Sequence, residues 1–215
     1  MELIESLISN GYLKTPRIIK AFRAIKRLDF LPGYLVQGNT NLESLADLNE
    51  ALPIGHGQTI SQPAVVAFML ELLDPRPGNN ILDIGSGSGW TSALLAQIVG
   101  DKGRITAVER IPEIYDFGKA NIDKYGYVKN GIVQTVCADG SLGLAANAPY
   151  DRILASAAAN EIPPPWLQQL TAGGIMVAPS GTSIKKFEKD RSGSIAVRDF
   201  QGFVFVPLVQ SRRNA

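Results

Sequence analysis

An apolar run that leads directly into three closely spaced glycines constrains this 215-residue chain more than any other feature. Residues 81–84 (ILDI) predict a buried strand, and Gly85, Gly87 and Gly89 follow it, just before a helical pattern that begins at Trp90. Glycine at such positions permits a tight turn and lets a ligand approach the backbone closely. The segment therefore predicts a strand, a binding loop and a helix in direct succession.

The pattern of this loop distinguishes it from two common phosphate-binding loops. A dinucleotide loop of the form G-x-G-x-x-G would need a glycine at position 90, where this chain has Trp90. A P-loop would need a lysine that the segment lacks. The remaining pattern, D-x-G-x-G-x-G from Asp83 to Gly89, resembles the cofactor loop of class I S-adenosylmethionine-dependent methyltransferases. That cofactor has no phosphate, so the loop need not cradle one.

From residue 80 onward, short apolar runs alternate with helical stretches, which predicts a mostly parallel sheet covered on both faces. Residues 194–198 and 202–206 are too close for a crossover helix and predict a terminal hairpin. We expect an α/β, Rossmann-like class I methyltransferase fold with a seven-stranded, mostly parallel sheet flanked by helices, an N-terminal helical extension and a C-terminal β-hairpin. The other expected strands are 80–84, 104–108, 131–137, 151–156 and 174–178, and the expected helices between them are 90–99, 112–125 and 164–170.

The first 62 residues predict a helical cap that ends in a loop. Apolar spacing predicts a helix over residues 2–10, and Thr15 before Pro16 predicts the capped start of a second. A third helix is expected from Gln62-Pro63 to Leu73, with Ser61 or Gln62 as its cap; the elements of residues 29–60 stay unassigned. We expect one domain over residues 1–215, with 1–62 as cap and substrate loop and 63–215 as the cofactor-binding body.

Acidic residues at strand ends suggest further cofactor contacts. Glu109 ends the second strand of the body, twenty residues beyond Gly89, where a carboxylate can accept hydrogen bonds from both ribose hydroxyls. Asp139 and Gly140 follow the third strand, where either the Asp139 carboxylate accepts a hydrogen bond from the adenine amino group or the neighbouring backbone frames the ring. Asp83, inside the first strand, is expected to orient the loop or the methionine amino group.

Composition excludes several functional classes. The formal charge is +1, which argues against a protein that holds nucleic acid by bulk electrostatics. One cysteine, Cys137, and one histidine exclude an intramolecular disulfide and sites rich in Cys or His, and we expect no metal. The longest uncharged run, 84–100, is too short to span a bilayer, and the acidic N-terminus does not resemble a signal peptide. We expect a cytoplasmic monomer without a membrane or nucleic-acid partner, with Cys137 buried and Lys185-Lys186 in a solvated loop.

A second motif is more specific than the glycine loop. Residues 57–63 (GQTISQP) look like the hallmark motif of protein-L-isoaspartate O-methyltransferases, which carry it just before the helix that leads into the cofactor domain. The resemblance covers nearly the whole chain. Further matches occur in order at residues 82–89, 139–140, 148–151, 157–159, 162–163, 169–170, 173–174 and 205–208.

The resemblance implies an activity and a set of site residues. The family transfers a methyl group from S-adenosyl-L-methionine to the free α-carboxylate of L-isoaspartyl residues in damaged proteins and peptides, releasing S-adenosyl-L-homocysteine. The ester then closes to a succinimide that starts repair. Ser61 matches the active site, and Gln58, Thr59 and Ile60 match the loop over cofactor and substrate. The implied cofactor-binding residues are these three together with Asp83, Gly85, Ser86, Gly87, Gly89, Glu109, Asp139 and Gly140.

Chemistry suggests what Ser61 does. A carboxylate with a pKa near 4 is already ionised at pH 7, so the reaction needs no general base. We expect the Ser61 hydroxyl to orient the acceptor without forming a covalent bond. Two alternatives stay open: a class I methyltransferase acting on another small molecule or on RNA, and a divergent relative that binds S-adenosylmethionine or a protein partner without catalysis. Loss of Ser61 should be tolerated only by the non-catalytic relative.

Overall fold

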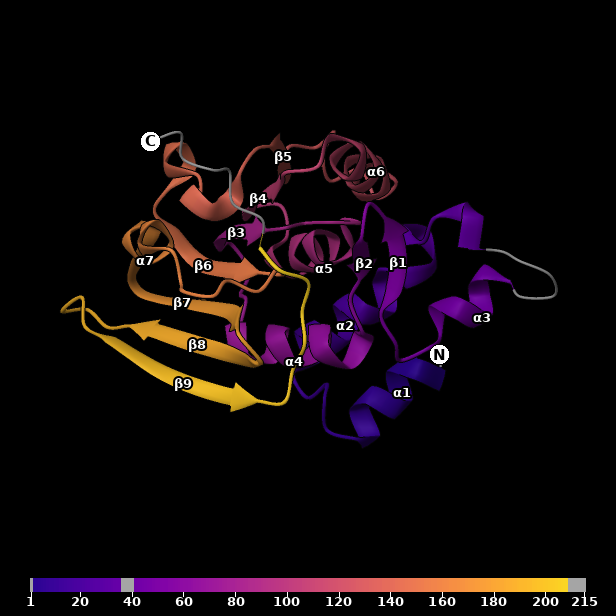
Figure 1. Ribbon diagram of the computed structural model, residues 1–215, viewed down its shortest axis with the longest axis horizontal. Coiled ribbons are helices and arrows are strands. Elements are labelled where there is room, and N and C mark those ends of the chain that lie inside the picture. The colour runs from indigo at the N-terminus through magenta and orange to yellow at the C-terminus, as the bar shows by residue number, and fades with distance from the viewer. Residues whose placement is uncertain (1, 36–40, 209–215) are drawn as a thin grey trace.

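A computed structural model describes residues 2–35 and 41–208. Its main sheet has seven strands in the order β5-β4-β3-β6-β7-β8-β9, and the pairs among β3 to β7 are parallel (Figure 1). The expected fold class is therefore confirmed. The strands are β3 Asn80–Ile84, β4 Arg104–Glu109, β5 Val133–Cys137, β6 Tyr150–Ala155, β7 Leu170–Ser180, β8 Ser183–Lys189 and β9 Ile195–Gln201.

Alternate side chains of the central strands enter two separate cores. In β3, Ile81 packs with the cluster that contains helices α4, α5 and α6, whereas Leu82 packs with the cluster around Trp166 of α7. This is the period of two that a strand imposes on its side chains. Both faces of the sheet are thus covered. The helices of the body are α4 Pro63–Leu73, α5 Trp90–Val99, α6 Pro112–Asp123 and α7 Pro164–Gln169, with 3-10 turns at Gly140–Leu142 and Ala145–Asn147.

The C-terminal hairpin exists, but its predicted position was wrong. It consists of β8 and β9, which pair in antiparallel register from Ser183 opposite Gln201 to Lys189 opposite Ile195. The residues expected to form the second strand, 202–206, leave the sheet after a bend at Gly202. Lys186 lies in β8 and is only 8% exposed, paired with Glu188, so the expected solvated loop was also wrong.

The N-terminal cap packs beside the body and contains the segment that the sequence left unassigned (Figure 1). Residues 52–60 form a small antiparallel hairpin of their own, apart from the main sheet. This hairpin leads directly into α4. The elements of the cap are α1 Glu2–Ser9, α2 Pro16–Ala24, the 3-10 turns Arg27–Phe30 and Gly33–Leu35, α3 Leu42–Ala46, β1 Leu52–Gly55 and β2 Gln58–Ile60.

Two expected helix caps are made differently. Thr15 precedes α2, but its hydroxyl donates to Glu71 of α4 at 2.6 Å instead of capping its own helix. Gln62 precedes α4 without a side-chain cap, and the Asn49 side-chain oxygen accepts the Ala64 amide at 2.9 Å instead. At α4 a side chain distant in sequence thus satisfies a terminal amide of the helix, whereas at α2 Glu71 binds the residues just before the helix. Both contacts tie the cap region to the body.

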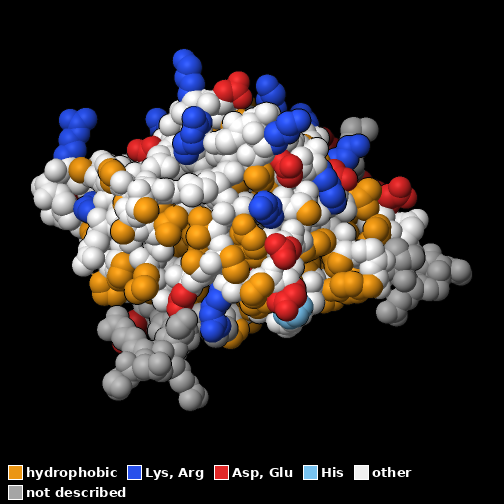
Figure 2. Space-filling view, turned by 90° about the horizontal axis from the view of Figure 1, so that it is seen from above, with side chains coloured by type: hydrophobic (Ala, Val, Ile, Leu, Met, Phe, Trp, Pro, Cys, Tyr) orange, Lys and Arg blue, Asp and Glu red, His pale blue; other side chains and the backbone are white. Residues whose placement is uncertain are grey.

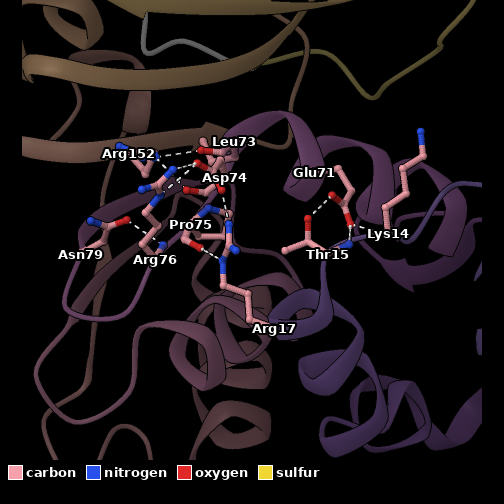
Figure 3. Close-up of polar contacts among 10 residues, drawn as sticks. All are labelled: Lys14, Thr15, Arg17, Glu71, Leu73, Asp74, Pro75, Arg76, Asn79 and Arg152. Carbon is pink, nitrogen blue, oxygen red and sulfur yellow. Dashed lines mark hydrogen bonds and ion pairs between the residues drawn. The ribbon is translucent and has the colours of Figure 1, made fainter.

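Three arginines gather where α4 ends, at the amino edge of the parallel strands (Figure 3). Asp74 adopts a left-handed conformation, and its carboxylate pairs with Arg17 and with Arg76. The Arg152 guanidinium of β6 donates to the Leu73 carbonyl at 2.8 Å. Cations at a helix C-terminus satisfy its last carbonyls and oppose the negative end of the helix dipole. This cluster therefore anchors α4 to the sheet.

The surface carries charges of both signs. On the face shown in Figure 2, lysines and arginines are interspersed with aspartates and glutamates, without a broad field of one sign.

Cys137, expected to be buried, is exposed at the end of β5. Among the helices of residues 2–35 and 41–208, none has the length and apolar character needed to cross a bilayer.

Candidate active site

A cavity of about 360 Å³ lies at the carboxyl edge of the parallel strands. In an open α/β sheet this edge is where ligands bind. Three segments form its walls: the glycine loop with the end of β4, the β2 strand with the turn after it, and the chain from 204 to 208. Its lining residues include Gln58, Thr59, Ile60, Ser61, Gly85, Ser86, Gly87, Glu109 and Gly140.

The glycine loop wraps around the end of β4. The amides of Gly85 and Ser86 both donate to the Val108 carbonyl, at 2.8 and 3.1 Å. Gly85 and Gly87 have φ values of 75° and 54°, which side chains with a Cβ rarely adopt. Both glycines and Ser86 line the cavity, so the backbone itself forms that wall.

Gly89 has a different task from the other two glycines. It is not among the cavity-lining residues; a Cβ there would lie 2.7 Å from the Gly118 carbonyl oxygen of α6. Conversely, a Cβ on Gly118 would lie 2.3 Å from the Gly87 carbonyl oxygen. Asn121, one turn further along α6, donates to the Ser88 carbonyl at 3.1 Å. The loop is thus seated on α6.

Gly118 and Asn121 were missed from the sequence. An isolated glycine inside a predicted helix was the available signal, because such a glycine often has a packing reason.

Glu109 lies at the cavity with its carboxylate held in place. It is 8% exposed. One oxygen accepts the Gly87 amide at 3.1 Å, and the other accepts the amides of Arg110 and Ile111 at 2.7 and 3.0 Å. A carboxylate has about four acceptor positions, so these three bonds fix its orientation and leave capacity for a ligand hydroxyl. The same residue therefore shapes the loop and faces the cavity.

Asp83 lies beneath the loop and does not line the cavity. It is fully buried, and one oxygen accepts the Ser92 hydroxyl at 2.5 Å. The other oxygen has no hydrogen-bond partner among the described residues. Burial raises the pKa of Asp83 to about 6; the hydrogen bond from Ser92 opposes the shift and the charge of Glu109 adds to it. Asp83 thus contacts the start of α5 and not the cavity.

Asp139 and Gly140 separate in the structure. Asp139 accepts the Ser141 amide at 2.9 Å and is not among the cavity-lining residues. Gly140 does line the cavity, and a Cβ there would lie 2.6 Å from Cγ2 of Ile84. The Trp166 indole donates to the Gly140 carbonyl at 2.9 Å. Gly140 is thus pressed against the floor of the sheet, where only a residue without a side chain fits.

The β1–β2 hairpin presents the motif residues to the cavity. Leu52 lies opposite Ile60, and the turn at 55–57 has positive φ at all three residues, including His56. Ile60 is 2% exposed and anchors the strand, whereas Thr59 is exposed at the cavity rim. Ser61 follows as a half-buried residue of the cavity wall. The hairpin therefore carries all four predicted motif residues to the same cavity as the glycine loop.

The chain after β9 closes the remaining side of the cavity. The Ala158 amide donates to the Val206 carbonyl at 2.8 Å, and the Leu208 amide donates to the Ala158 carbonyl at 2.7 Å. Val204, at the rim, is 91% exposed. This wall was not foreseen, because the sequence placed 202–206 in a strand. Val209, beyond it, lies outside the described residues.

The cavity fits a nucleoside-like ligand with a positive charge. Its volume lies within the roughly 300–1,000 Å³ typical of small-molecule sites. Apolar side chains of Ile84 and Val108 form its inner walls, bare glycine backbone allows close approach, and the Glu109 carboxylate supplies negative charge. In residues 2–35 and 41–208, no group of three or more His, Cys, Asp or Glu side chains is placed to hold a metal ion.

Sequence comparison decides the family. The profile of the family described as protein-L-isoaspartate(D-aspartate) O-methyltransferase matches residues 1–213. The chain belongs to this family. It is a family of S-adenosylmethionine-dependent enzymes, so the resemblance, the enzyme class and the cofactor expected from the sequence are confirmed.

Relatives agree over nearly the full length. The protein-L-isoaspartate O-methyltransferases of Aeropyrum pernix and Methanopyrus kandleri are each 42% identical to the present chain. The alignments cover 97% and 96% of this chain and 78% and 89% of the two relatives. The cap, the motif hairpin and the body therefore all lie within the shared region.

Solved structures of two proteins named as protein-L-isoaspartate O-methyltransferases share the fold. One superposes with a TM-score of 0.82 at 26% identity over 96% of this chain, which spans 64% of that protein's length. The second, from Plasmodium falciparum and solved with S-adenosyl-L-homocysteine, gives a TM-score of 0.84 at 20% identity over 98% of both chains. The second likeness shows the fold alone.

Proposed function

We propose that this chain methylates the free α-carboxylate of L-isoaspartyl residues in damaged proteins and peptides. One observation carries the proposal: the hairpin with Thr59, Ile60 and Ser61 and the glycine loop line the same cavity. An acceptor at the hairpin and a cofactor at the loop would then meet at a single place. The methyl ester leaves the enzyme and closes to a succinimide, whose hydrolysis returns part of the material to aspartate.

The cofactor half of the site is proposed at the carboxyl ends of β3, β4 and β5. S-adenosylmethionine supplies a methyl group bonded to a positively charged sulfur. The backbone of Gly85, Ser86 and Gly87 contacts the methionine half, and the remaining acceptor position of Glu109 takes a hydrogen bond from a ribose hydroxyl. Gly140 lies against the adenine. Three residues act indirectly: Asp83 through Ser92, Gly89 by seating the loop on α6, and Asp139 by shaping the turn before Gly140.

Ser61 is proposed to align the acceptor. The hydroxyl donates one hydrogen bond to the substrate carboxylate and keeps the other carboxylate oxygen directed at the methyl carbon. That oxygen would form the new bond to the methyl carbon while the methyl–sulfur bond breaks and its electron pair stays on the sulfur of S-adenosyl-L-homocysteine. No proton has to be removed, because the acid is already ionised at pH 7. An anion and a cation become neutral in this step, so a neutral donor suits the site better than a lysine or arginine, which would stabilise the ionised substrate more than the transition state.

The rest of the motif hairpin is proposed to hold the substrate chain. Gln58 and Thr59 lie at the rim and would contact the peptide near the isoaspartate, whereas buried Ile60 fixes the strand from behind. Residues 1–62 thus serve as cap and acceptor side, and residues 63–215 as the cofactor-binding body, within one domain. We further propose a cytoplasmic monomer whose partners are damaged proteins, not nucleic acid or membranes.

The proposal is tested with two synthetic peptides that differ only in carrying L-isoaspartate or normal L-aspartate. Each is incubated with the protein and methyl-labelled S-adenosylmethionine. We expect base-labile label in the isoaspartyl peptide alone, because a carboxyl methyl ester is hydrolysed by base. A structured RNA is incubated in parallel. Label in that RNA, or in neither peptide although the protein binds S-adenosyl-L-homocysteine, would contradict the proposed acceptor.

A further inference from the structure

Arg27 is a buried cation whose hydrogen bonds all go to main-chain carbonyls. It begins the 3-10 turn Arg27–Phe30 and is 5% exposed. Nη1 donates to the Leu48 carbonyl at 2.9 Å and more weakly to the Ala46 carbonyl at 3.4 Å. Nη2 donates to the Glu50 carbonyl at 2.6 Å and to the Ser61 carbonyl at 3.3 Å. One guanidinium therefore holds both ends of the segment that contains the motif hairpin.

No acidic side chain of the described residues forms an ion pair with Arg27. Burial lowers the pKa of Arg27 to about 10, so the group is still protonated at neutral pH. A buried charge without a counter-charge is unfavourable unless dipoles compensate it. Here the carbonyls of one loop provide that compensation at Nη1 and Nη2, whereas Nε has no hydrogen-bond partner among the described residues. The loop conformation and the buried charge therefore depend on each other.

The same guanidinium also contacts the cofactor side of the cavity. Its central carbon lies 5.6 Å from the centre of the Trp90 ring, a cation–π distance. Trp90 begins α5 directly after the glycine loop, lines the cavity, and has an edge-on contact with Phe22 at 5.6 Å. Arg27 thus lies between the loop that carries Ser61 and the helix that follows the cofactor loop.

We propose that Arg27 is a positioning residue: it fixes Ser61 relative to the cofactor loop by binding the carbonyls on both sides of the motif hairpin and the Trp90 ring at once. The inference rests on the proposed function, because it assumes that Ser61 aligns the acceptor. Arg27 does not touch substrate or the reacting atoms. A displacement of about 1 Å at such a site can reduce the rate about a hundredfold, even when the changed residue is remote from the chemistry.

Lysine cannot substitute for this arrangement. A guanidinium donates from a rigid planar fork and stacks on an aromatic ring, whereas an ammonium is a point charge with three donors. Arg152 offers a matched control, since it is 8% exposed and its guanidinium donates to the carbonyls of Leu73, Asp74 and Asp151. These contacts, drawn in Figure 3, lie at the amino edge of the sheet, and Arg152 is not among the cavity-lining residues.

The test compares Arg27→Lys with Arg152→Lys, and Arg27→Gln serves as a second variant at the first position. For each we would measure kcat and KM for the isoaspartyl peptide, the Kd of S-adenosyl-L-homocysteine, the melting temperature and hydrogen exchange of residues 46–61. We expect both lysine variants to lower the melting temperature. Only the Arg27 variants should lower kcat/KM for the peptide, by at least about tenfold. Their Kd for S-adenosyl-L-homocysteine should change by less than about threefold.

The exchange readout separates this inference from the proposed function. We expect residues 46–61 to exchange faster in Arg27→Lys than in Arg152→Lys. Equal exchange in the two, equal kcat/KM, or failure of both Arg27 variants to fold would overturn the positioning role. An active-site assignment that is wrong would instead show itself in the wild-type protein, as absence of transfer to the isoaspartyl peptide, with the exchange difference intact.

Discussion

The two edges of the parallel sheet each bury an arginine against main-chain carbonyls, yet their surroundings differ. At the amino edge, Arg152 has Asp74 and Asp151 as acidic neighbours, and their charges oppose the lowering of its pKa by burial. At the carboxyl edge, Arg27 has carbonyl groups and an aromatic ring. The amino edge is filled with ion pairs and helix-end contacts, whereas the carboxyl edge opens onto the cavity.

The difference suggests a division of work between the edges. Asp74 and its arginines anchor α4 and hold the scaffold, so changes there should reduce stability and spare activity. The open carboxyl edge holds Ser61, Glu109 and the glycine loop that packs on Gly118. Changes there should therefore reduce ligand binding or turnover. The following predictions test that division, from the largest expected effect to the smallest.

Removing the Ser61 hydroxyl should have the largest effect. We expect Ser61→Ala to lower kcat/KM for the isoaspartyl peptide about 10²- to 10³-fold, as removal of one aligned hydrogen-bond donor does in other enzymes. The Kd of S-adenosyl-L-homocysteine, measured by calorimetry, should change less than about twofold. An unchanged turnover would remove Ser61 from the mechanism and favour a non-catalytic relative.

Asp83 should make stability depend on pH. Its pKa in the folded protein is raised to about 6 from 3.8, so the folded state binds the proton more tightly than the unfolded state. The stabilisation is therefore present below about pH 4 and is lost as pH rises through 6. Relative to Asp83→Asn, the wild type should lose about 2–3 kcal/mol of unfolding free energy between pH 4 and pH 7.

Urea unfolding across this pH range measures the difference. The exposed Asp116→Asn, on α6, is the control and should follow the wild-type curve. Parallel curves for wild type and Asp83→Asn would mean that Asp83 is not the buried acid that the structure indicates.

A methyl group on Gly118 should disturb the cofactor loop. Its Cβ would lie 2.3 Å from the Gly87 carbonyl oxygen, so the loop or α6 must move. We expect Gly118→Ala to weaken S-adenosyl-L-homocysteine binding at least about tenfold and to lower stability by about 1–3 kcal/mol. Gly33→Ala is the control, because nothing lies within 4 Å of its Cβ. Equal affinities of the two variants for S-adenosyl-L-homocysteine would show that packing on α6 does not position the glycine loop.

The amino edge should show the smallest effect on function. Asp74→Ala removes the partner of Arg17 and Arg76 and leaves an alanine at a φ of 51°, a left-handed conformation that aspartate tolerates better. We expect a loss of about 1–2 kcal/mol in unfolding free energy, because the pairs are partly exposed and the left-handed conformation is unfavourable for alanine. Asp74→Gly should be less destabilised than Asp74→Ala. Both variants should keep kcat/KM within about twofold of the wild-type value. A tenfold loss would contradict the expectation that changes at the amino edge spare activity.

The sequence predicted the parallel core well because those strands are buried on both faces and read as short apolar runs. Residues 80–84 and 90–99 were predicted to the residue. The prediction from the sequence failed at β8. There Lys185 and Lys186 interrupt the apolar pattern, although the strand is paired on both sides. Local pattern cannot report which strand a charged segment pairs with.

At the site, the sequence identified groups that motifs carry and missed those that tertiary structure creates. Ser61, Glu109 and Gly140 all line the cavity. Glu109 and Gly140 were expected there because they follow strand ends, and Ser61 because of its motif. Arg27 could not be found, because a lone arginine in sequence is normally a surface residue and its carbonyl partners are 19 to 34 positions away. Such partners are fixed only when the cap folds onto the body.

The most direct test of the division is hydrogen exchange of the whole protein with and without S-adenosyl-L-homocysteine and an isoaspartyl peptide. We predict that the product cofactor protects segments around 85–87 and 109–111, that the peptide adds protection at 58–61, and that 73–76 and 150–152 are unchanged. Protection centred on 73–76 and 150–152, with none at the carboxyl edge, would contradict the account.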